Sequence, residues 1–183
     1  MTITQLHNIQ PFMGQMPRIA ANAYVHASAT VIGDVVIGAE SSIWPQAVVR
    51  ADVNSIRIGI GSNIQDLTTL HVNYRSSADP LGAPLVIGDY VTVGHNVVLH
   101  GCTIQDTCLI GMGSIVMDKV LIEPQVLLAA GSLVPEGKVL ESGYLYVGRP
   151  AKKVRTLTSA EIQHLMDSAN NYIALKNQYL LTV

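Results

Sequence analysis

The chain has few aromatic side chains and little charge. Its 183 residues include one Phe and one Trp, and charged residues make up 13% of the total. The usual charged share is about a quarter. Hydrophobic residues reach 49% almost without large aromatics, which favours a single domain whose core consists of many small, similar aliphatic layers. Because so little charge is available to cover a free surface, we also expect the chain to associate with itself.

No segment has the features of a nucleic-acid-binding or membrane protein. The formal net charge is -2, and no basic patch is present that would bind nucleic acid or an anionic membrane. Residues 1–18 lack the charged start and apolar stretch of a signal peptide. The longest apolar runs, such as Val126–Ala130, are too short to span a bilayer. These absences predict a cytoplasmic protein.

Cysteine is also scarce, because Cys102 and Cys108 are the only two in the chain. Two cysteines do not make a disulfide framework. Both lie in strand-like sequence, so we interpret them as buried thiols in a reducing compartment. A redox role or a local disulfide is the alternative interpretation.

An aliphatic residue recurs at every sixth position over most of the chain. A period of six fits neither an amphipathic helix nor an alternating strand. It is typical of an all-β parallel β-helix, in which each hexapeptide forms a short strand and a turn, and three hexapeptides make one triangular coil. The repeats therefore predict a prism of about six coils spaced ~4.8 Å apart. The aliphatic positions are Ile19, Val25, Val31, Ile37, Ile43, Val49, Ile58, Ile64, Leu70, Ile87, Val93, Leu99, Ile104, Ile110, Val116, Ile122, Leu128 and Val134.

The repeat also divides the chain. The β-helix is expected over residues 19–135, preceded by an N-terminal arm over residues 1–18. Residues 74–84 interrupt the period with Ser, Pro and Gly, which predicts a loop ejected from the prism. After residue 135 the period is no longer obvious, so residues 136–157 are expected to form an irregular linker.

A helix is predicted over residues 158–180. Thr158 is a good N-cap, and Glu161 follows at the capping-box spacing. Apolar residues recur on one face of this segment, at positions such as Leu165 and Ala169. We interpret it as a packing helix that covers the surface of the prism and strengthens an oligomer.

Two histidines occupy equivalent positions in the repeat. Leu70 and Leu99 stack on adjacent coils once the ejected loop is left out of the count. His71 and His100 follow them directly, so their side chains are predicted to stack ~5 Å apart. Imidazole nitrogens at that spacing can share one Zn²⁺ ion. The alternative interpretation is a set of unrelated surface histidines.

A third histidine belongs to a different column of the repeat. His95 precedes His100 by five residues, which places it up to ~16 Å away along an extended chain. We therefore expect that it does not reach the ion held by its own chain. In a threefold trimer, each metal site would take His71 and His100 from one subunit and His95 from the neighbouring one.

Further polar residues fall beside these histidines. Gln65 lies in the His95 column, one coil below, and Asn63 is close to it. Arg50 lies beneath His71. We interpret Arg50, Asp52 and Asp66 as an intersubunit ion-pair cluster that sets the register of the interface and takes no part in the chemistry.

Six short segments of the chain carry a further signal: Val-Arg-Ala-Asp at 49–52, Asn-Ile-Gln-Asp at 63–66, Leu-His at 70–71, Gly-His at 94–95, Leu-His-Gly at 99–101 and Tyr-Leu-Tyr-Val-Gly at 144–148. Together these segments resemble the γ-class carbonic anhydrases, and most closely their short bacterial, YrdA-type members. The resemblance covers nearly the whole chain and implies a left-handed β-helix that forms a homotrimer. It also implies a metal ion at each subunit interface, with zinc as the usual ion and iron or cobalt as alternatives.

The same resemblance implies an activity and assigns residues to it. The activity is the reversible hydration of CO₂ to bicarbonate, which makes the protein a carbonate dehydratase, a lyase. Three neutral histidine ligands leave an open position on zinc, where a water molecule has a pKa near 7. The assigned metal ligands are His71, His95 and His100, and the residues assigned beside the bound water are Gln65 and Asn63. Tyr146 matches a tyrosine near the site of these enzymes and is counted with the catalytic residues.

One feature of the best-studied γ enzymes is missing. They carry acidic proton carriers at two places where this chain has Val53 and the segment Val72, Asn73 and Tyr74. Since a tyrosine of ordinary pKa near 10 is a poor carrier at pH 7, CO₂ hydration is expected to be weak. Two alternatives stay open: an acyl-CoA thioester hydrolase or transferase of the hexapeptide-repeat type, and a catalytically silent trimer stapled by metal ions.

Overall fold

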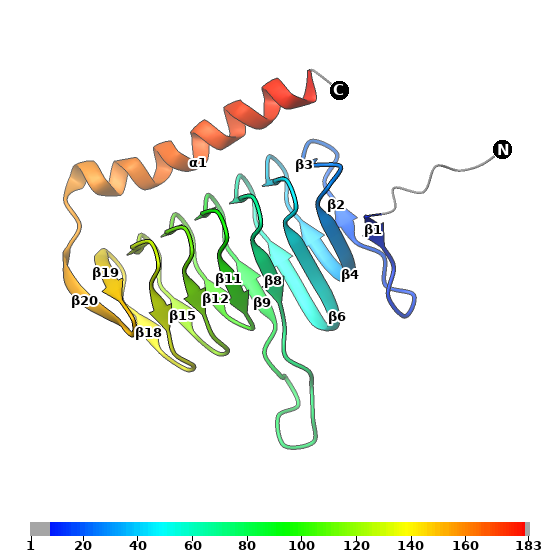
Figure 1. Ribbon diagram of the computed structural model, residues 1–183, viewed down its shortest axis with the longest axis horizontal. Helices are drawn as coiled ribbons and strands as arrows, with labels where there is room; N and C mark the ends of the chain where they lie inside the picture. Colours follow the sequence, from blue (N-terminus) through cyan, green and yellow to red (C-terminus); the bar gives the residue numbers. More distant parts are fainter. Residues whose placement is uncertain (1–7, 182–183) are drawn as a thin grey trace.

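The computed structural model describes residues 8–181. Short parallel strands stack into an elongated prism, and one helix, α1 (Ser159–Leu180), lies along its side (Figure 1). This arrangement confirms the predicted parallel β-helix followed by a C-terminal helix.

The strands of the described residues form three faces, and seven parallel strands stack on each. Strands β4 and β6 are long enough to turn a corner and belong to both the first and the second face. The first face contains β1 (Ile9–Gln10), β4 (Thr30–Ile37), β6 (Val48–Ile58), β8 (Thr69–His71), β11 (Val98–His100), β14 (Ile115–Val116) and β17 (Leu133–Val134). The second contains β2 (Arg18–Ile19), β4, β6, β9 (Leu85–Ile87), β12 (Thr103–Ile104), β15 (Leu121–Ile122) and β18 (Val139–Leu140). The third contains β3 (Tyr24–Val25), β5 (Ser42–Ile43), β7 (Asn63–Ile64), β10 (Thr92–Val93), β13 (Leu109–Ile110), β16 (Leu127–Leu128) and β19 (Tyr144–Gly148).

The prism is longer than the six coils expected, because strands form at both ends of the predicted repeat. In the expected N-terminal arm, β1 pairs with β4 and β2 also joins the prism. The expected linker, residues 136–157, instead contains β18, β19 and β20 (Ala151–Thr156), which runs antiparallel to β19. The six-residue period in fact continues from Val134 to Leu140 and Tyr146, whose side chains are buried in the core.

Aliphatic side chains at the sixth positions fill the interior. Val31, Val49, Leu70 and Leu99 are completely buried and stack on one another through paired strands. Cys102 and Cys108 are free and buried, as predicted. Burial raises the pKa of the Cys108 thiol to about 12, so this thiol stays protonated at neutral pH.

Helix α1 begins as predicted. The Thr158 side chain accepts a hydrogen bond from the backbone N–H of Glu161, and the Glu161 carboxylate accepts one from the backbone N–H of Thr158. Leu165 and Ala169 are buried, and α1 contacts strands β5, β7 and β10 of the prism. Among residues 8–181, no helix is long and apolar enough to cross a membrane.

A cluster of aromatic side chains holds the second half of α1 on the third face. Trp44 packs against Tyr172 and Tyr179 with ring centroids 5.5 and 5.1 Å apart, and Tyr24 contacts both Trp44 and Tyr179. Four of the nine Phe, Trp and Tyr side chains of this chain are therefore concentrated where the helix meets the prism.

The ejected loop is present where the sequence predicts it. Residues 74–84 leave the prism between β8 and β9 and project away from α1 (Figure 1). Strands β8 and β11 pair directly across the insertion, so the loop does not disturb the register of the coils.

Candidate metal centre

His71 and His100 stack as the repeat predicts. They are Cα partners at the ends of the paired strands β8 and β11. Their ring centroids lie 5.1 Å apart, and the Nδ1 atom of His71 lies 3.1 Å from the Nε2 atom of His100. The two side chains therefore bring one nitrogen each to a common point.

A carboxylate lies against the outer nitrogen of each ring. The Oδ1 atom of Asp52 lies 3.1 Å from His71 Nε2, and the Oδ1 atom of Asp118 lies 2.6 Å from His100 Nδ1. An imidazole that donates its outer N–H to a carboxylate turns the lone pair of its other nitrogen inward. Histidines that bind metal ions are almost always held in this way.

The geometry of this pair fits a zinc ion. Two ligand nitrogens at 2.0–2.1 Å from a tetrahedral zinc ion lie about 3.3 Å apart, close to the 3.1 Å between His71 and His100. Burial lowers the pKa of His71, and the neighbouring Arg50 and His100 lower it further, against the opposing effect of Asp52. The net result favours the neutral imidazole, which is the form that binds a metal ion.

Arg50 supports this pair through Asp52. Its guanidinium donates to Asp52 Oδ2, while Asp52 Oδ1 faces His71. Burial alone would raise the pKa of Asp52, but the hydrogen bonds from Arg50 and His71 outweigh it and hold this pKa below the usual value. The Asp52 carboxylate therefore stays charged and oriented.

His95 lies elsewhere on the chain, in the turn that follows β10 on the third face. Its Nδ1 atom lies 3.0 Å from Asp66 Oδ2, which leaves Nε2 available on a side chain that is 47% exposed. Asp66 thus pairs with His95, and Arg50 pairs with Asp52, so one chain does not bring the three predicted ion-pair residues together. Within residues 8–181 no group of three or more His, Cys, Asp or Glu side chains is placed to hold a metal ion.

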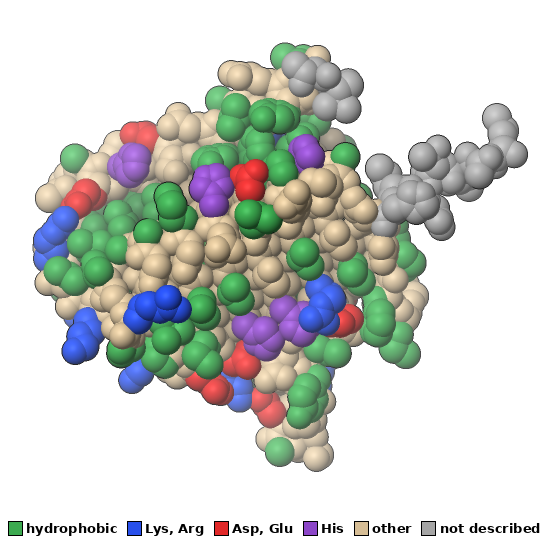
Figure 2. All heavy atoms as spheres, viewed as in Figure 1, with side chains coloured by type: hydrophobic (Ala, Val, Ile, Leu, Met, Phe, Trp, Pro, Cys, Tyr) green, Lys and Arg blue, Asp and Glu red, His purple; other side chains and the backbone are tan. Residues whose placement is uncertain are grey.

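The space-filling view agrees with this separation. Histidine side chains lie side by side at one place, next to acidic and basic side chains, and other histidine side chains lie apart from them (Figure 2). A single chain therefore offers a histidine pair at one location and a carboxylate-oriented histidine at another.

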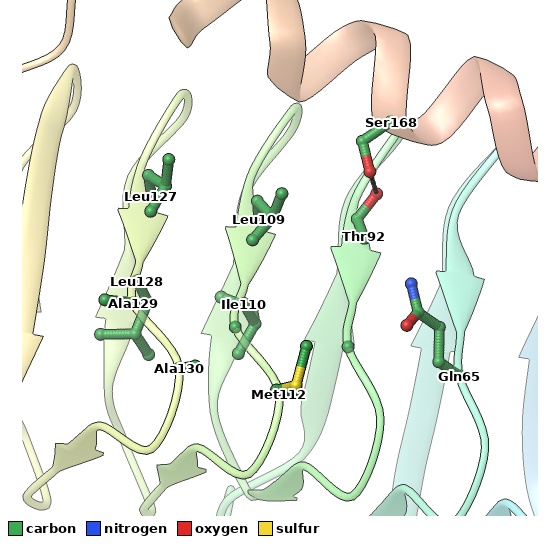
Figure 3. Close-up of a pocket in the computed structure, with 12 residues that line it drawn as sticks. Gln65, Thr92, Leu109, Ile110, Met112, Leu127, Leu128, Ala129, Ala130 and Ser168 are labelled. Atoms are coloured by element: carbon green, nitrogen blue, oxygen red, sulfur yellow. Dashed lines mark hydrogen bonds between the residues drawn. The ribbon is translucent and has the colours of Figure 1, made fainter.

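The amide side chains of Asn63 and Gln65 are buried at strand β7, which pairs with β10, the strand that precedes His95. Gln65 Nε2 donates to Asn63 Oδ1 at 3.1 Å, and Asn63 Nδ2 donates to the Thr92 hydroxyl at 3.1 Å. The Thr92 hydroxyl in turn donates to Ser168 of α1 at 3.1 Å (Figure 3). This chain of hydrogen bonds fixes which way both amide groups face.

A cavity of about 310 Å³ adjoins Gln65, between α1 and the outer side of the third face (Figure 3). Apart from Gln65, Thr92 and Ser168, its walls are mostly apolar side chains, including Leu109, Leu127 and Met112. The amide of Gln65 lies at one end of this cavity, so a molecule bound there would have a hydrogen-bonding group beside an apolar surface.

Tyr146 lies away from Gln65 and Asn63 of its own chain. It sits on β19, four strand spacings from β7 along the third face, which is about 19 Å. Its side chain occupies an inward position of the repeat and is buried in the core, where its hydroxyl accepts the Glu141 N–H at 2.8 Å. Within one chain, Tyr146 therefore belongs to the interior of the last coil.

Asp118 is a residue of the site that the sequence interpretation missed, although a signal for it exists. It follows Val116 by two residues, and Val116 stacks one coil above Leu99. A carboxylate at that place of the repeat lies next to the coil that carries His100. Thr92 and Ser168 were also missed, since no spacing in the sequence connects a strand to a distant helix.

The six-residue repeat, the stacked coils and the histidine pair define a hexapeptide-repeat protein with a candidate metal centre. The family model for bacterial transferase hexapeptide (six repeats) matches residues 16–51. In a solved structure of a hexapeptide transferase family protein from Anaplasma phagocytophilum, the fold is similar with a TM-score of 0.87 and 44% identity. That match covers 93% of this chain and 97% of the other.

Curated relatives narrow this class. Protein YrdA of Escherichia coli is 48% identical over 94% of both chains, and a carbonic anhydrase of Geobacillus kaustophilus is 44% identical over 93% of this chain and 90% of its own. Gamma carbonic anhydrase 2, a mitochondrial protein of Arabidopsis thaliana, is 46% identical over 87% of this chain but only 57% of the plant protein. The chain belongs to the γ-class carbonic anhydrase-like family of hexapeptide-repeat proteins, among its short bacterial, YrdA-type members.

Proposed function

We propose that this chain is a zinc-dependent, cytoplasmic carbonic anhydrase-like protein that hydrates CO₂ reversibly to bicarbonate at the subunit interfaces of a homotrimer. The observation that carries the proposal is the pair His71 and His100, whose inner nitrogens converge at 3.1 Å while Asp52 and Asp118 hold the outer ones. The third ligand in this proposal is His95 of a neighbouring subunit. Relatives named carbonic anhydrases support the same activity.

In this proposal, the residues of the site have different roles. His71, His95 and His100 would hold the ion, which when bound supplies Lewis-acid activation of water. Gln65, next to His95, would orient the attacking water with its amide. Asn63 holds the Gln65 amide in place, and in this proposal stabilises the CO₂ oxygen that gains charge.

Removal of the proton is the slow part of the proposed reaction. Val53 and Val72 offer no titratable group, and the side chain of Asn73 is occupied by a hydrogen bond to Asp118. Tyr74 is 64% exposed, so small buffer molecules have access to this side of the site. Proton transfer to buffer is therefore expected to limit the rate.

Stopped-flow measurement of CO₂ hydration tests the proposal. The zinc-loaded protein is expected to hydrate CO₂ slowly in a weak buffer and faster when imidazole is added as a proton carrier. A His95→Ala variant is expected to lose both the metal and the activity. No hydration by fully zinc- or iron-loaded protein, with or without imidazole, would reject the carbonic anhydrase assignment.

The apolar cavity beside Gln65 favours a second candidate function. A space of about 310 Å³ exceeds what CO₂ needs, and its Leu109 and Leu127 walls suit a short acyl chain. Hydrolysis or transfer of an acyl-CoA thioester at the same centre would use this space. A panel of acyl-CoA thioesters of increasing chain length tests it: thioester turnover that depends on chain length, together with no CO₂ hydration, would replace the first proposal.

A further inference from the structure

The ejected loop is fastened to the prism at its neck. The buried side chain of Asn54 donates to the carbonyl oxygens of Asn73 at 3.0 Å and Leu81 at 2.9 Å. The backbones of Asn73 and Ala83 also pair with each other. One buried amide and one backbone pair therefore hold the two ends of the loop together.

Asn73 at the neck of the loop and Asp79 within it contact two consecutive residues of the turn after β14. Asn73 Nδ2 donates to Asp118 Oδ2 at 3.1 Å, and Asp79 forms an ion pair with Lys119 at 2.7 Å. The other oxygen of Asp118 is the one that holds His100 at 2.6 Å. A continuous path of hydrogen bonds thus runs from the neck of the loop to one histidine of the pair.

The glycine that follows His100 makes this path possible. A Cβ atom on Gly101 would lie 2.3 Å from Asp118 Oδ1 and 2.5 Å from the side chain of Ala83. Gly101 also has a φ of +51°, which disfavours other residues. Only the absence of a side chain there lets Asp118 and the returning end of the loop approach His100 together.

We propose that the neck of the ejected loop positions the metal ligand His100, with Asn73 and Asp118 as the positioning residues. This inference rests on the metal centre of the proposed function. Each histidine of the pair is then oriented by a carboxylate that a second side chain fixes by a hydrogen bond. Arg50 donates to Asp52, which contacts His71. In the same way, Asn73 donates to Asp118, which contacts His100. The first support is built into strand β6, whereas the second depends on Asn73, at the neck of a surface loop.

The physical reason is that a carboxylate held at only one oxygen can rotate. With both oxygens engaged, Asp118 keeps the Nδ1–H of His100 in place and turns Nε2 toward His71. Without Asn73, water would replace one of these hydrogen bonds, and the ring of His100 would lose part of its fixed orientation. Metal affinity would then fall although no ligand has been removed.

The test is Zn²⁺ affinity of the full chain, measured by competition with a chromogenic chelator. Asp118→Ala is expected to weaken binding about 10–100-fold, the range typical of residues that orient metal-binding histidines. Asn73→Ser keeps a polar group for the local turn but is too short to reach Asp118. Its Zn²⁺ affinity is expected to fall less than that of Asp118→Ala, by about 3–10-fold. The absorption spectrum of the Co²⁺-loaded protein should change in both variants, which reports ligand geometry independently of activity.

A double-mutant cycle and a matched control complete the test. Adding Asn73→Ser to Asp118→Ala should cost nothing further, because Asn73 acts through Asp118. Asp79→Asn removes the other anchor of the loop without touching Asp118 and should leave affinity unchanged. Wild-type affinity in Asn73→Ser, additive losses in the double variant, or an equal loss in Asp79→Asn would each overturn the inference. A wild-type chain that binds no Zn²⁺ would instead overturn the proposed function itself.

Discussion

The Nζ atom of Lys176 lies 2.7 Å from the Oε2 atom of Glu40 and joins the end of α1 to the turn between β4 and β5. Lys176 is 1% exposed, whereas Glu40 is 37% exposed. The ammonium group also approaches the side-chain oxygen of Asn177 at 2.6 Å. The C-terminal helix is therefore fixed to the prism by a buried cation whose counter-ion can still contact solvent.

This asymmetry predicts unequal effects of two substitutions. Glu40→Gln leaves the Lys176 ammonium buried without its anion and should cost about 3 kcal/mol of unfolding free energy. Lys176→Met fills the same space with an apolar side chain and frees Glu40 to hydrate, so its cost should be clearly smaller. Urea unfolding of the two variants measures both values. A larger cost for Lys176→Met would contradict this account.

A second prediction concerns the sharing of metal sites between subunits. His71→Ala and His95→Ala chains should each bind little zinc alone. When the two are co-expressed in equal amounts, about one interface in four combines an intact His71 with an intact His95 from its neighbour, given random assembly of a cyclic trimer. Metal analysis should then recover about a quarter of wild-type zinc, as expected from the same statistics.

A histidine outside the candidate centre provides a control for this experiment. His26 pairs with Ser28 at 2.8 Å outside the candidate centre, so His26→Ala should bind zinc like wild type. A centre formed within one chain would give no recovery on co-expression, and light scattering that shows a monomer with full metal content would exclude sharing.

A third prediction uses the exposed side of the loop. Tyr74 is 64% exposed and lies in a segment where the best-studied γ enzymes carry an acidic proton carrier. Tyr74→Glu should therefore supply a carboxylate that accepts protons at neutral pH. In weak buffer, CO₂ hydration by zinc-loaded protein should rise about tenfold, at the low end of what proton-transfer groups contribute. Saturating imidazole should abolish the difference from wild type, and Tyr74→Gln should show no gain.

A fourth prediction concerns the start of α1 in acid. Hydrogen bonds from Arg155 and from Thr158 lower the pKa of Glu161 from 4.5 to about 2. A carboxylate whose pKa is depressed by folding stabilises the native state above pH 4.5, and that contribution is lost as the pH falls toward 2. Glu161→Gln should therefore destabilise the protein at pH 7 and show a weaker loss of stability between these pH values.

The matching substitution at the other end of the capping box separates charge from geometry. Thr158→Ala removes the N-cap acceptor and should cost about 0.5–2 kcal/mol. Thermal unfolding followed over the same pH range should show that this cost varies less with pH than the effect of Glu161→Gln. Equal pH profiles for the two variants would argue against the role given to the Glu161 carboxylate.

Several features could be predicted because they follow from a repeat along the chain. A period of six places Leu70 and Leu99 in one column, and the ejected loop does not change that register, so the stacking of His71 on His100 followed from counting alone. The capping box of α1 followed in the same way from a spacing of three residues. Both are consequences of backbone geometry that repeats regardless of its surroundings.

The repeat was recognised over too short a range at its end. Pro135 and the charged residues after it masked the continued period, so Leu140 and Tyr146 were not assigned to the core. The parallel pairing of β16 with β19 places Tyr146 in the last coil of its own chain.

The sequence by itself determined the coils, their inward aliphatic columns and the alignment of the two histidines, because these depend on backbone pairing with a constant period. The tertiary structure alone decided which carboxylates face the outer nitrogens, how Asn73 joins the loop to Asp118, and how Ser168 of α1 joins the amides of Gln65 and Asn63. These contacts link segments separated by up to 76 residues. They depend on side-chain directions at the corners of the prism and on the packing of a loop and a helix. Neither of these follows the six-residue period of the sequence.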